Sequence, residues 1–133
     1  MLELTINGTV YQFKFGMGFM RTINKKIGKP VDGLPDVKEN VGLQYYVSEL
    51  LVGDTEALEM ILDAANNGMK PRVTTQLLDE YIDDEDTDID DLFKEVIDFL
   101  KKGNATKKTV VPFIEEVEKA KKAQEKEQEK ARN

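Results

Sequence analysis

The first fifteen residues alternate between apolar and polar side chains, which is the pattern of strands with one buried face. Asn7-Gly8 falls midway, and this dipeptide tolerates the positive φ angles of a two-residue type I′ turn. Such a turn sets three cross-strand pairs, namely Ile6 with Thr9, Leu4 with Tyr11 and Leu2 with Phe13. The face predicted to be buried carries Leu2, Leu4, Ile6, Tyr11, Phe13 and Phe15. A lone hairpin is marginal in water, so this face must rest on helices, on another subunit or on both.

After Gly18 the apolar residues recur at helical spacing, and turn residues separate the segments. The spacing predicts helices over about 19–27, 36–52, 54–66, 75–83 and 89–102, and a last helix after a 104–109 linker. The fifth has the most regular stripe, which consists of Ile89, Leu92, Phe93, Val96, Ile97 and Leu100. The predicted fold is therefore mainly α, a small bundle of five to six helices with an N-terminal β-hairpin.

Local signals mark the ends of these segments. Residues 28–35 form a Gly- and Pro-rich loop, and Asp36 with Glu39 resembles a capping box. Pro112 is expected in the first turn of the last helix, where its missing N–H costs no intrahelical bond. We predict a hairpin plus helical body over residues 1–112 and a charged C-terminal helix or tail over 113–133. Residues 121–133 have no apolar face, so they form either a projecting helix or a frayed end.

The amino-acid composition excludes several kinds of site and partner. The 133 residues include no Cys, His or Trp, which excludes disulfides, thiolate metal sites and His general bases. No segment approaches a membrane span, and no secretion signal is evident, so we expect a cytosolic protein. The net charge is −7, and residues 79–98 hold eleven acids against one base. This acidic run argues against a nucleic-acid partner, which would need clustered Lys and Arg.

The acidic run invites comparison with a calcium-binding loop. Counted from Asp84, carboxylates fall at the ligand positions of an EF-hand and end on Glu95 at position 12. Position 6 is Ile89, however, where the sharp turn of that loop needs Gly. Ile89 also belongs to the apolar stripe of the fifth helix. We therefore favour an acidic helix cap and a solvated helix face, and we expect no metal.

Other catalytic signals are weak. The segment "GMGFM" contains a G-x-G, but a third Gly and a surrounding βαβ unit are missing. Ser48 and the threonines have no His partner that would activate them. Nothing indicates a concave apolar setting for the paired carboxylates. We expect neither an enzyme nor a cofactor.

Methionine and phenylalanine gather directly after the hairpin. Met17, Phe19 and Met20 are explained most simply as core residues that seal the hairpin onto the helices. Because methionine adapts to varied apolar partners, contact with a partner is the alternative, and a groove edge would serve both. The candidate residues for partner binding or self-association are Leu2, Leu4, Tyr11, Phe13, Phe15, Met17, Phe19 and Met20.

The opening "LTINGTVYQFKFGMGFMRTINK" resembles the tail assembly chaperones of long-tailed phages that infect Gram-positive bacteria. The shared features are the hairpin with its Asn-Gly turn, the aromatic alternation, and Phe-Gly-x-Gly-Phe before a helix that carries Ile-Asn-Lys. The resemblance is sharpest over residues 2–27, and the body is similar in its acidic helical character. It implies an assembly protein and no catalysis.

The resemblance also implies the partners. Such chaperones hold the long, mostly helical tape-measure protein while the tail tube assembles around it, and they are absent from the mature virion. A longer frameshifted form contacts the tail tube protein. The implied location is the host bacterial cytoplasm, and a homo-oligomer is expected, with no nucleic acid and no membrane.

An alternative function comes from the acidic run itself. Residues 79–91 would then mimic nucleic acid, and the chain would be an acidic helical interaction or inhibitor protein for a basic partner. Binding of that kind depends strongly on salt. Apolar holding of a tape-measure protein depends on salt much less.

We predict self-association through residues 2–20, because the exposed backbone edges of a hairpin pair readily with a neighbouring chain. Replacing Asn7 and Gly8 by two prolines should open the turn and lower the mass measured by light scattering. An unchanged mass with an intact circular dichroism spectrum would exclude the hairpin as the association element.

Overall fold

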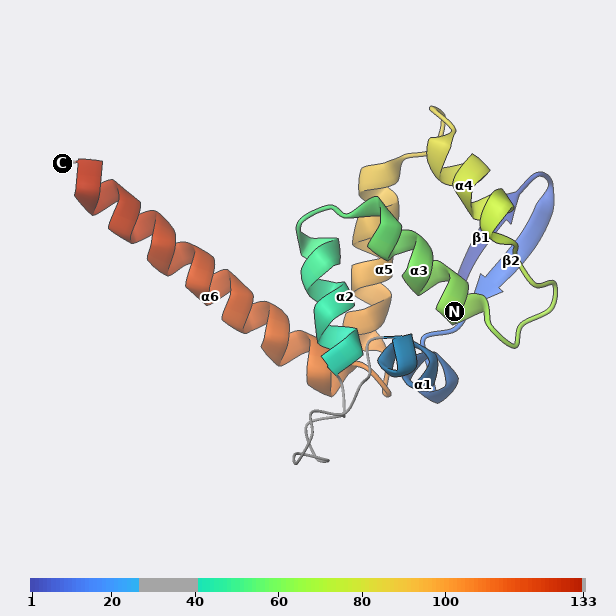
Figure 1. The fold of residues 1–133 in the computed structure, drawn as a ribbon, viewed down its shortest axis with the longest axis horizontal. Helices are drawn as coiled ribbons and strands as arrows, with labels where there is room; N and C mark the ends of the chain where they lie inside the picture. The colour runs from blue at the N-terminus through green and yellow to red at the C-terminus, as the bar shows by residue number, and fades with distance from the viewer. Residues whose placement is uncertain (27–40, 133) are drawn as a thin grey trace.

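The computed structural model of the protein describes residues 1–26 and 41–132, and within them a hairpin is followed by six helices (Figure 1). The elements are β1 (Leu2–Ile6), β2 (Thr9–Phe13), α1 (Met17–Lys26), α2 (Val41–Leu51), α3 (Thr55–Asn66), α4 (Thr75–Asp83), α5 (Ile89–Lys102) and α6 (Lys107–Arg132). The predicted fold class is confirmed. The predicted loop 28–35, the Asp36–Glu39 capping box and the expected start of the second helix lie outside the described residues.

The hairpin has the predicted register. Leu2 pairs with Phe13, Leu4 with Tyr11 and Ile6 with Thr9 across two antiparallel strands. Asn7 and Gly8 have φ angles of 50° and 77°, which is the left-handed conformation that a type I′ turn requires. The alternation of buried and exposed side chains along β1 follows directly from this register.

The apolar face of the hairpin belongs to the core of the chain itself. The side chains that line this face are buried together with residues of α1, α2, α3 and α5. Strand β2 lies against α3, and the backbone N–H of Lys14 donates a 2.8 Å hydrogen bond to the carbonyl of Ala65. The helices therefore supply the support that a lone hairpin lacks.

A buried amide fixes the hairpin to the end of α3. The Asn66 side chain is fully buried, and its Nδ2 donates to the carbonyls of Gln12 (2.9 Å) and Pro71 (3.3 Å). Its Oδ1 accepts from the Val73 N–H at 2.7 Å and from Arg72 Nη1 at 2.9 Å. One side chain thus joins β2, the end of α3 and residues 71–73, and all its main hydrogen-bonding positions are used.

Helices α1 and α2 approach closely at a glycine. A Cβ on Gly42 would lie 2.5 Å from the carbonyl oxygen of Ile23 and 2.8 Å from the Cα of Asn24. Both neighbours are backbone atoms, so only glycine permits this crossing. The Asn24 side chain also accepts a 3.2 Å hydrogen bond from the Leu43 N–H, which satisfies a donor in the first turn of α2.

Polar side chains cap the next three helices. The Asp54 carboxylate accepts from the N–H groups of Glu56 and Ala57, Thr74 caps α4, and Asp88 caps α5 through the N–H of Asp91. Capping by Ser, Thr, Asp or Asn typically contributes about 1 kcal/mol. These caps place the helix starts where the sequence predicts them, and Asp88 confirms the acidic cap at the start of α5.

Pro112 lies about one turn further into the last helix than the sequence predicted, so that prediction was wrong. Helix α6 begins at Lys107, because Lys107 N–H bonds to Gly103 and Val110 N–H bonds to Thr106, so Pro112 lies inside the helix. Its missing N–H removes the intrahelical hydrogen bond to the carbonyl of Lys108, and both residues are exposed. The buried Thr106 hydroxyl, which donates to the Leu100 carbonyl at 2.6 Å, fixes this early start.

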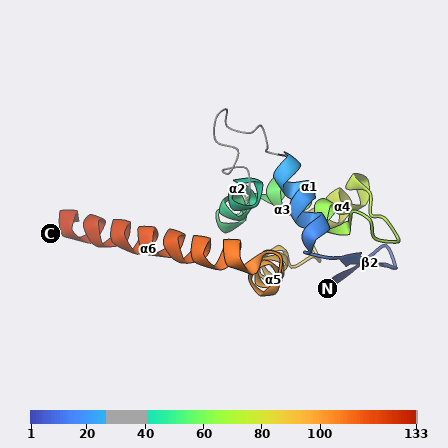
Figure 2. The same ribbon diagram turned by 90° about the horizontal axis from the view of Figure 1, so that it is seen from below.

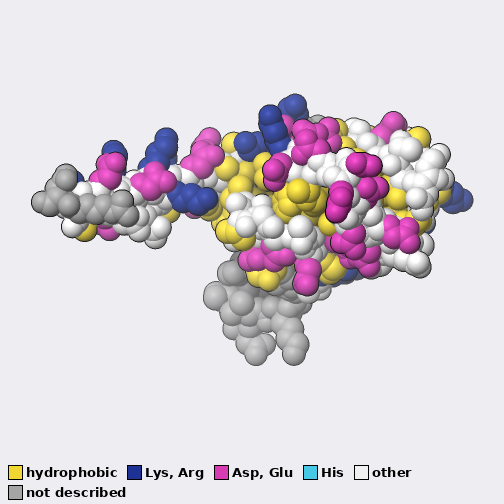
Figure 3. Space-filling view, turned by 90° about the horizontal axis from the view of Figure 1, so that it is seen from above, with side chains coloured by type: hydrophobic (Ala, Val, Ile, Leu, Met, Phe, Trp, Pro, Cys, Tyr) yellow, Lys and Arg dark blue, Asp and Glu magenta, His cyan; other side chains and the backbone are white. Residues whose placement is uncertain are grey.

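The second half of α6 projects from the body (Figures 1 and 2). Its first turns pack on α2 and α5 through Val110 and Ile114, whereas every side chain from 118 to 131 is exposed. Acidic and basic side chains lie along this projection, while acidic side chains dominate the visible face of the body (Figure 3). Of the two alternatives for residues 121–132, the structure has the projecting helix, which runs without a break across position 112.

Replacing Asn66 by alanine should lower the free energy of unfolding by about 2–4 kcal/mol. The substitution removes the hydrogen-bond partner of the Val73 N–H and of the carbonyls of Gln12 and Pro71 in a buried setting. Urea unfolding measures the change, with Asn67→Ala as the matched control. Asn67 is exposed, so its replacement should cost less than about 1 kcal/mol. Equal costs for the two variants would contradict a special role for Asn66.

Candidate functional site

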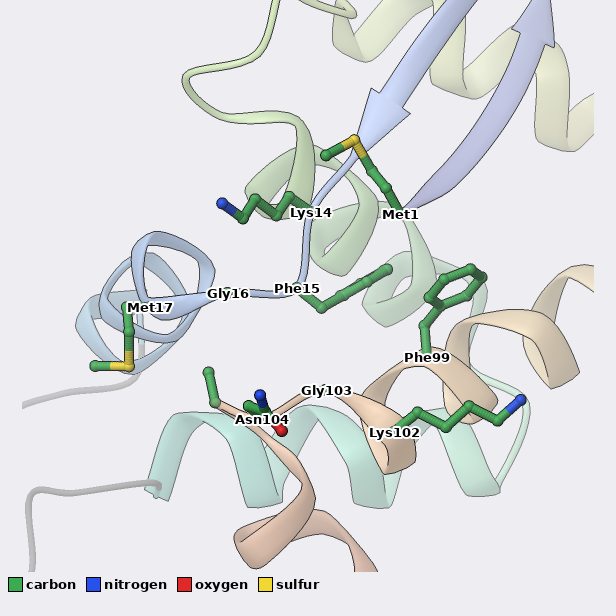
Figure 4. A pocket seen from close by; sticks show the side chains of 10 residues that line it. Met1, Lys14, Phe15, Gly16, Met17, Phe99, Lys102, Gly103 and Asn104 are labelled. Carbon is green, nitrogen blue, oxygen red and sulfur yellow. The ribbon is translucent and has the colours of Figure 1, made fainter.

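An apolar hollow lies where the hairpin leads into α1 and where α5 turns into α6 (Figure 4). Its volume is about 680 Å³, which is within the range of protein binding pockets. The lining comes from two segments that are distant in the sequence, residues 14–17 and 99–105, together with Met1. Tertiary packing alone brings these segments together.

Aromatic rings form the floor of this hollow. Phe15 stacks on Phe99 with ring centroids 6.0 Å apart. The Phe15 ring also packs edge to face with the Phe19 ring, at a centroid distance of 5.2 Å. Such aromatic pairs contribute about 0.5–1.5 kcal/mol beyond their buried area. Phe15 itself is buried, so the floor is held rigidly by the core beneath it.

Flexible side chains form the rim. Met1 and Met17 are 59% and 58% exposed, which is unusual for side chains of this size and polarity. Lys14 and Lys102 are the charged residues in the lining, and Figure 4 shows them on opposite sides of Phe15. The hollow therefore combines an apolar floor, an adaptable apolar rim and positive charge.

A glycine permits the close approach of the two segments. A Cβ on Gly103 would lie 2.8 Å from the Thr106 hydroxyl and 3.3 Å from the carbonyl oxygen of Phe15. The φ angle of Gly103 is −65°, so the lack of a side chain matters here and left-handed geometry does not. Gly103 ends α5 as predicted and also brings the α5–α6 turn against the hairpin exit.

A second, more polar hollow of about 400 Å³ lies between α3 and α4. Burial and a hydrogen bond with Asp79 raise the pKa of Glu59 from 4.5 to about 7, with further contributions from the charges of Asp79, Asp63 and Asp83. Asp63 is also paired with Arg72 at 2.9 Å. This hollow concentrates negative charge and has little apolar surface to offer a partner.

The carboxylates of the former calcium-loop candidate are used locally. Asp84 accepts from the N–H of Asp86, and Asp88 caps α5. Among residues 1–26 and 41–132, no group of three or more His, Cys, Asp or Glu side chains is arranged to hold a metal ion. In the same ranges, no helix is both long enough and apolar enough to cross a membrane.

A family model described as "Phage tail assembly chaperone protein, TAC" matches residues 3–116, which include the hairpin from its second residue, the lining of the hollow apart from Met1, and the first turns of α6. The chain belongs to the phage tail assembly chaperone family. Comparisons with curated proteins and with solved structures gave no significant match. The resemblance predicted from the N-terminal segment is thus confirmed, and it extends across α5. Most of the projecting part of α6 lies beyond the matched range.

The structure separates the predicted contact residues of this chaperone into two groups. Phe15 and Met17 line the hollow. The expectation that Met17 is a core residue was wrong, because its side chain is exposed. The others are buried within the chain, namely Leu2, Leu4, Tyr11, Phe13, Phe19 and Met20. Any contact through the hairpin must then use its edges or its outer face, and self-association through residues 2–20 stays a prediction.

Sequence reasoning missed half of the hollow. Phe99 was available as a signal, because it is apolar yet lies outside the regular stripe of α5. Lys14 and Lys102 gave no signal, since lysines in an alternating strand and at a helix end are ordinary. Only the fold shows that they share one site.

Replacing Glu59 by glutamine should raise the free energy of unfolding at pH 8 by about 0.5–1.5 kcal/mol, a range reduced for solvent screening. The raised pKa means that folded Glu59 keeps its proton up to about pH 7, whereas the unfolded chain loses it near 4.5. The folded state therefore loses stability as the pH rises through this window, and glutamine removes that loss. Near pH 4 the two proteins should be equally stable.

Urea unfolding at both pH values tests this, and Glu116→Gln on the exposed face of α6 is the matched control. A gain in the free energy of unfolding that is the same at pH 4 and pH 8, or no larger than that of the control, would show that the folded state does not raise the pKa of Glu59.

Proposed function

We propose that this tail assembly chaperone binds the tape-measure protein and keeps it soluble while the tail tube assembles. Membership of the family over residues 3–116 is the observation that carries the proposal. The role is one of binding, without catalysis, in the host bacterial cytoplasm, and the chaperone leaves before the virion is complete.

The physical properties of the chain support holding of an apolar client. A long helical tape-measure protein has apolar stripes that stay bare until the tube closes, and bare stripes of that size aggregate. The hollow offers apolar surface with adaptable methionines at its rim. The net charge of −7 keeps the outer surface of a complex solvated.

Further partners follow from the same proposal. We expect the chaperone to act as a homo-oligomer, so that several copies cover a long client. A longer frameshifted form would add contact with the tail tube protein. The projecting half of α6 is compatible with this, because it extends a charged helix away from the body (Figure 2).

Co-expression with the tape-measure protein of the same phage should yield a soluble complex, whereas the tape-measure protein alone should be insoluble. Since the contact is apolar, the complex should persist from low to about 1 M salt, where the Debye length is only about 3 Å. Size exclusion with light scattering measures the complex and its stoichiometry.

A complex that dissociates as the salt concentration rises would instead favour the acidic alternative. In that function the exposed acids of residues 79–91 would bind a basic partner. Absence of any complex at low salt would refute tape-measure binding outright.

A further inference from the structure

We propose that the hollow seats a large apolar side chain of an amphipathic partner helix whose flanking residues are acidic. The inference rests on the proposed function and specifies which segments of the tape-measure protein the chaperone selects. It also identifies Lys14 and Lys102 as the residues that set this preference.

The size and lining of the hollow fit an apolar anchor. A volume of about 680 Å³ accommodates a Leu, Phe or Met side chain together with part of the helix that carries it. Phe15 and Phe99 provide a rigid floor, whereas the exposed Met1 and Met17 adapt to anchors of different shape. A client with many dissimilar apolar segments needs such tolerance.

The backbone of the site favours a helix over an extended segment. Met1 and Lys14 adjoin the two strands, but no lining residue belongs to β1 or β2, so the hollow itself offers an extended partner no strand residues to pair with. A helix satisfies its own backbone hydrogen bonds and presents only side chains. The helix-in-groove mode is therefore the one that this site supports.

Charge complementarity identifies the flanking residues. Lys14 and Lys102 lie on opposite sides of Phe15 and are the charged members of the lining (Figure 4). Within the ranges that the structure describes, neither lysine takes part in an ion pair. Acids one helical turn before and after the anchor would lie about 6 Å to either side of it, within reach of long lysine side chains.

The rest of the surface makes this preference specific. The net charge of −7 and the acidic belt of residues 79–98 disfavour binding of an acidic helix at the α4–α5 end of the body. A second, shallow apolar surface lined by Lys101, Lys107 and Lys108 continues the positive charge along the α5–α6 turn. An acidic client helix is thus directed to this end of the molecule.

Two labelled peptides of about 20 residues test the proposal, a length above the roughly 12–15 residues below which isolated helices are marginal. Both carry one leucine stripe, flanked by glutamates in the first peptide and by lysines in the second. Fluorescence anisotropy at low salt should show the glutamate peptide binding the full chain at least about 10-fold more tightly. Equal binding, or tighter binding of the lysine peptide as the net charge alone would predict, overturns the proposal.

Two single variants locate the site. Met17→Glu should weaken binding of the glutamate peptide by at least about 10-fold, because it places a negative charge in the apolar rim of the hollow. The fold should survive, since an acid in the first turn of α1 suits the helix dipole. Val52→Glu, at a 73% exposed position directly after the end of α2 and outside the lining of the hollow, should bind like the wild type. Loss of binding in Val52→Glu and not in Met17→Glu would place the site elsewhere.

A double variant tests the lysines directly. Lys14→Glu with Lys102→Glu should reverse the preference, so that the lysine peptide binds more tightly than the glutamate peptide. An unchanged preference would refute the role of the two lysines. Light scattering of the Met17→Glu chain alone is needed as well, because a fall in mass would mean that a second copy fills the hollow, which overturns the assignment to a client helix.

Co-expression distinguishes this inference from the proposed function. If the wild-type chain and Met17→Glu both keep the tape-measure protein soluble, the function stands and the hollow is not its site. If the wild type fails to hold the tape-measure protein, the proposed function fails, and this client-helix inference fails with it.

Discussion

The position of the hairpin depends on the buried amide of Asn66. This side chain gives hydrogen bonds to the carbonyls of Gln12 and Pro71 and takes one from the Val73 N–H, so it joins three segments that have no continuous secondary structure in common. Buried polar groups are costly when unpaired, which makes their geometry demanding. A two-stranded hairpin has little stability of its own, and this network gives it one fixed orientation on α3.

The hollow follows from that orientation. With β2 fixed, the Lys14 N–H reaches the Ala65 carbonyl, and the next residue places its ring against Phe99. Gly103 completes the site, because a side chain there would collide with Thr106 and crowd the backbone of Phe15. The apolar side chains that remain exposed at this corner, Met1 and Met17, are those that the core of the chain does not cover.

Charge is distributed along the body in the sense that the helix dipoles favour. Acids crowd the N-terminal turn of α5 and lysines its C-terminal turn, which stabilises the helix locally. The same arrangement separates an acidic belt from a basic corner at the α5–α6 turn. A feature that is explained by helix stability therefore also gives the hollow a charge opposite to that of the acidic belt.

The sequence by itself determined the elements. The Asn7-Gly8 turn fixed the register of the hairpin, and the apolar spacing and capping residues set α3, α4 and α5, because these signals act within a few residues. The start of α6 was misjudged, since a buried hydroxyl at Thr106 outweighed the local preference of Pro112. Only the tertiary structure decided that Met17 is exposed, although its sequence context favoured the core, and that Lys14 and Lys102 line one site. Those outcomes depend on contacts between residues about 85 positions apart, and periodicity carries no information at that range.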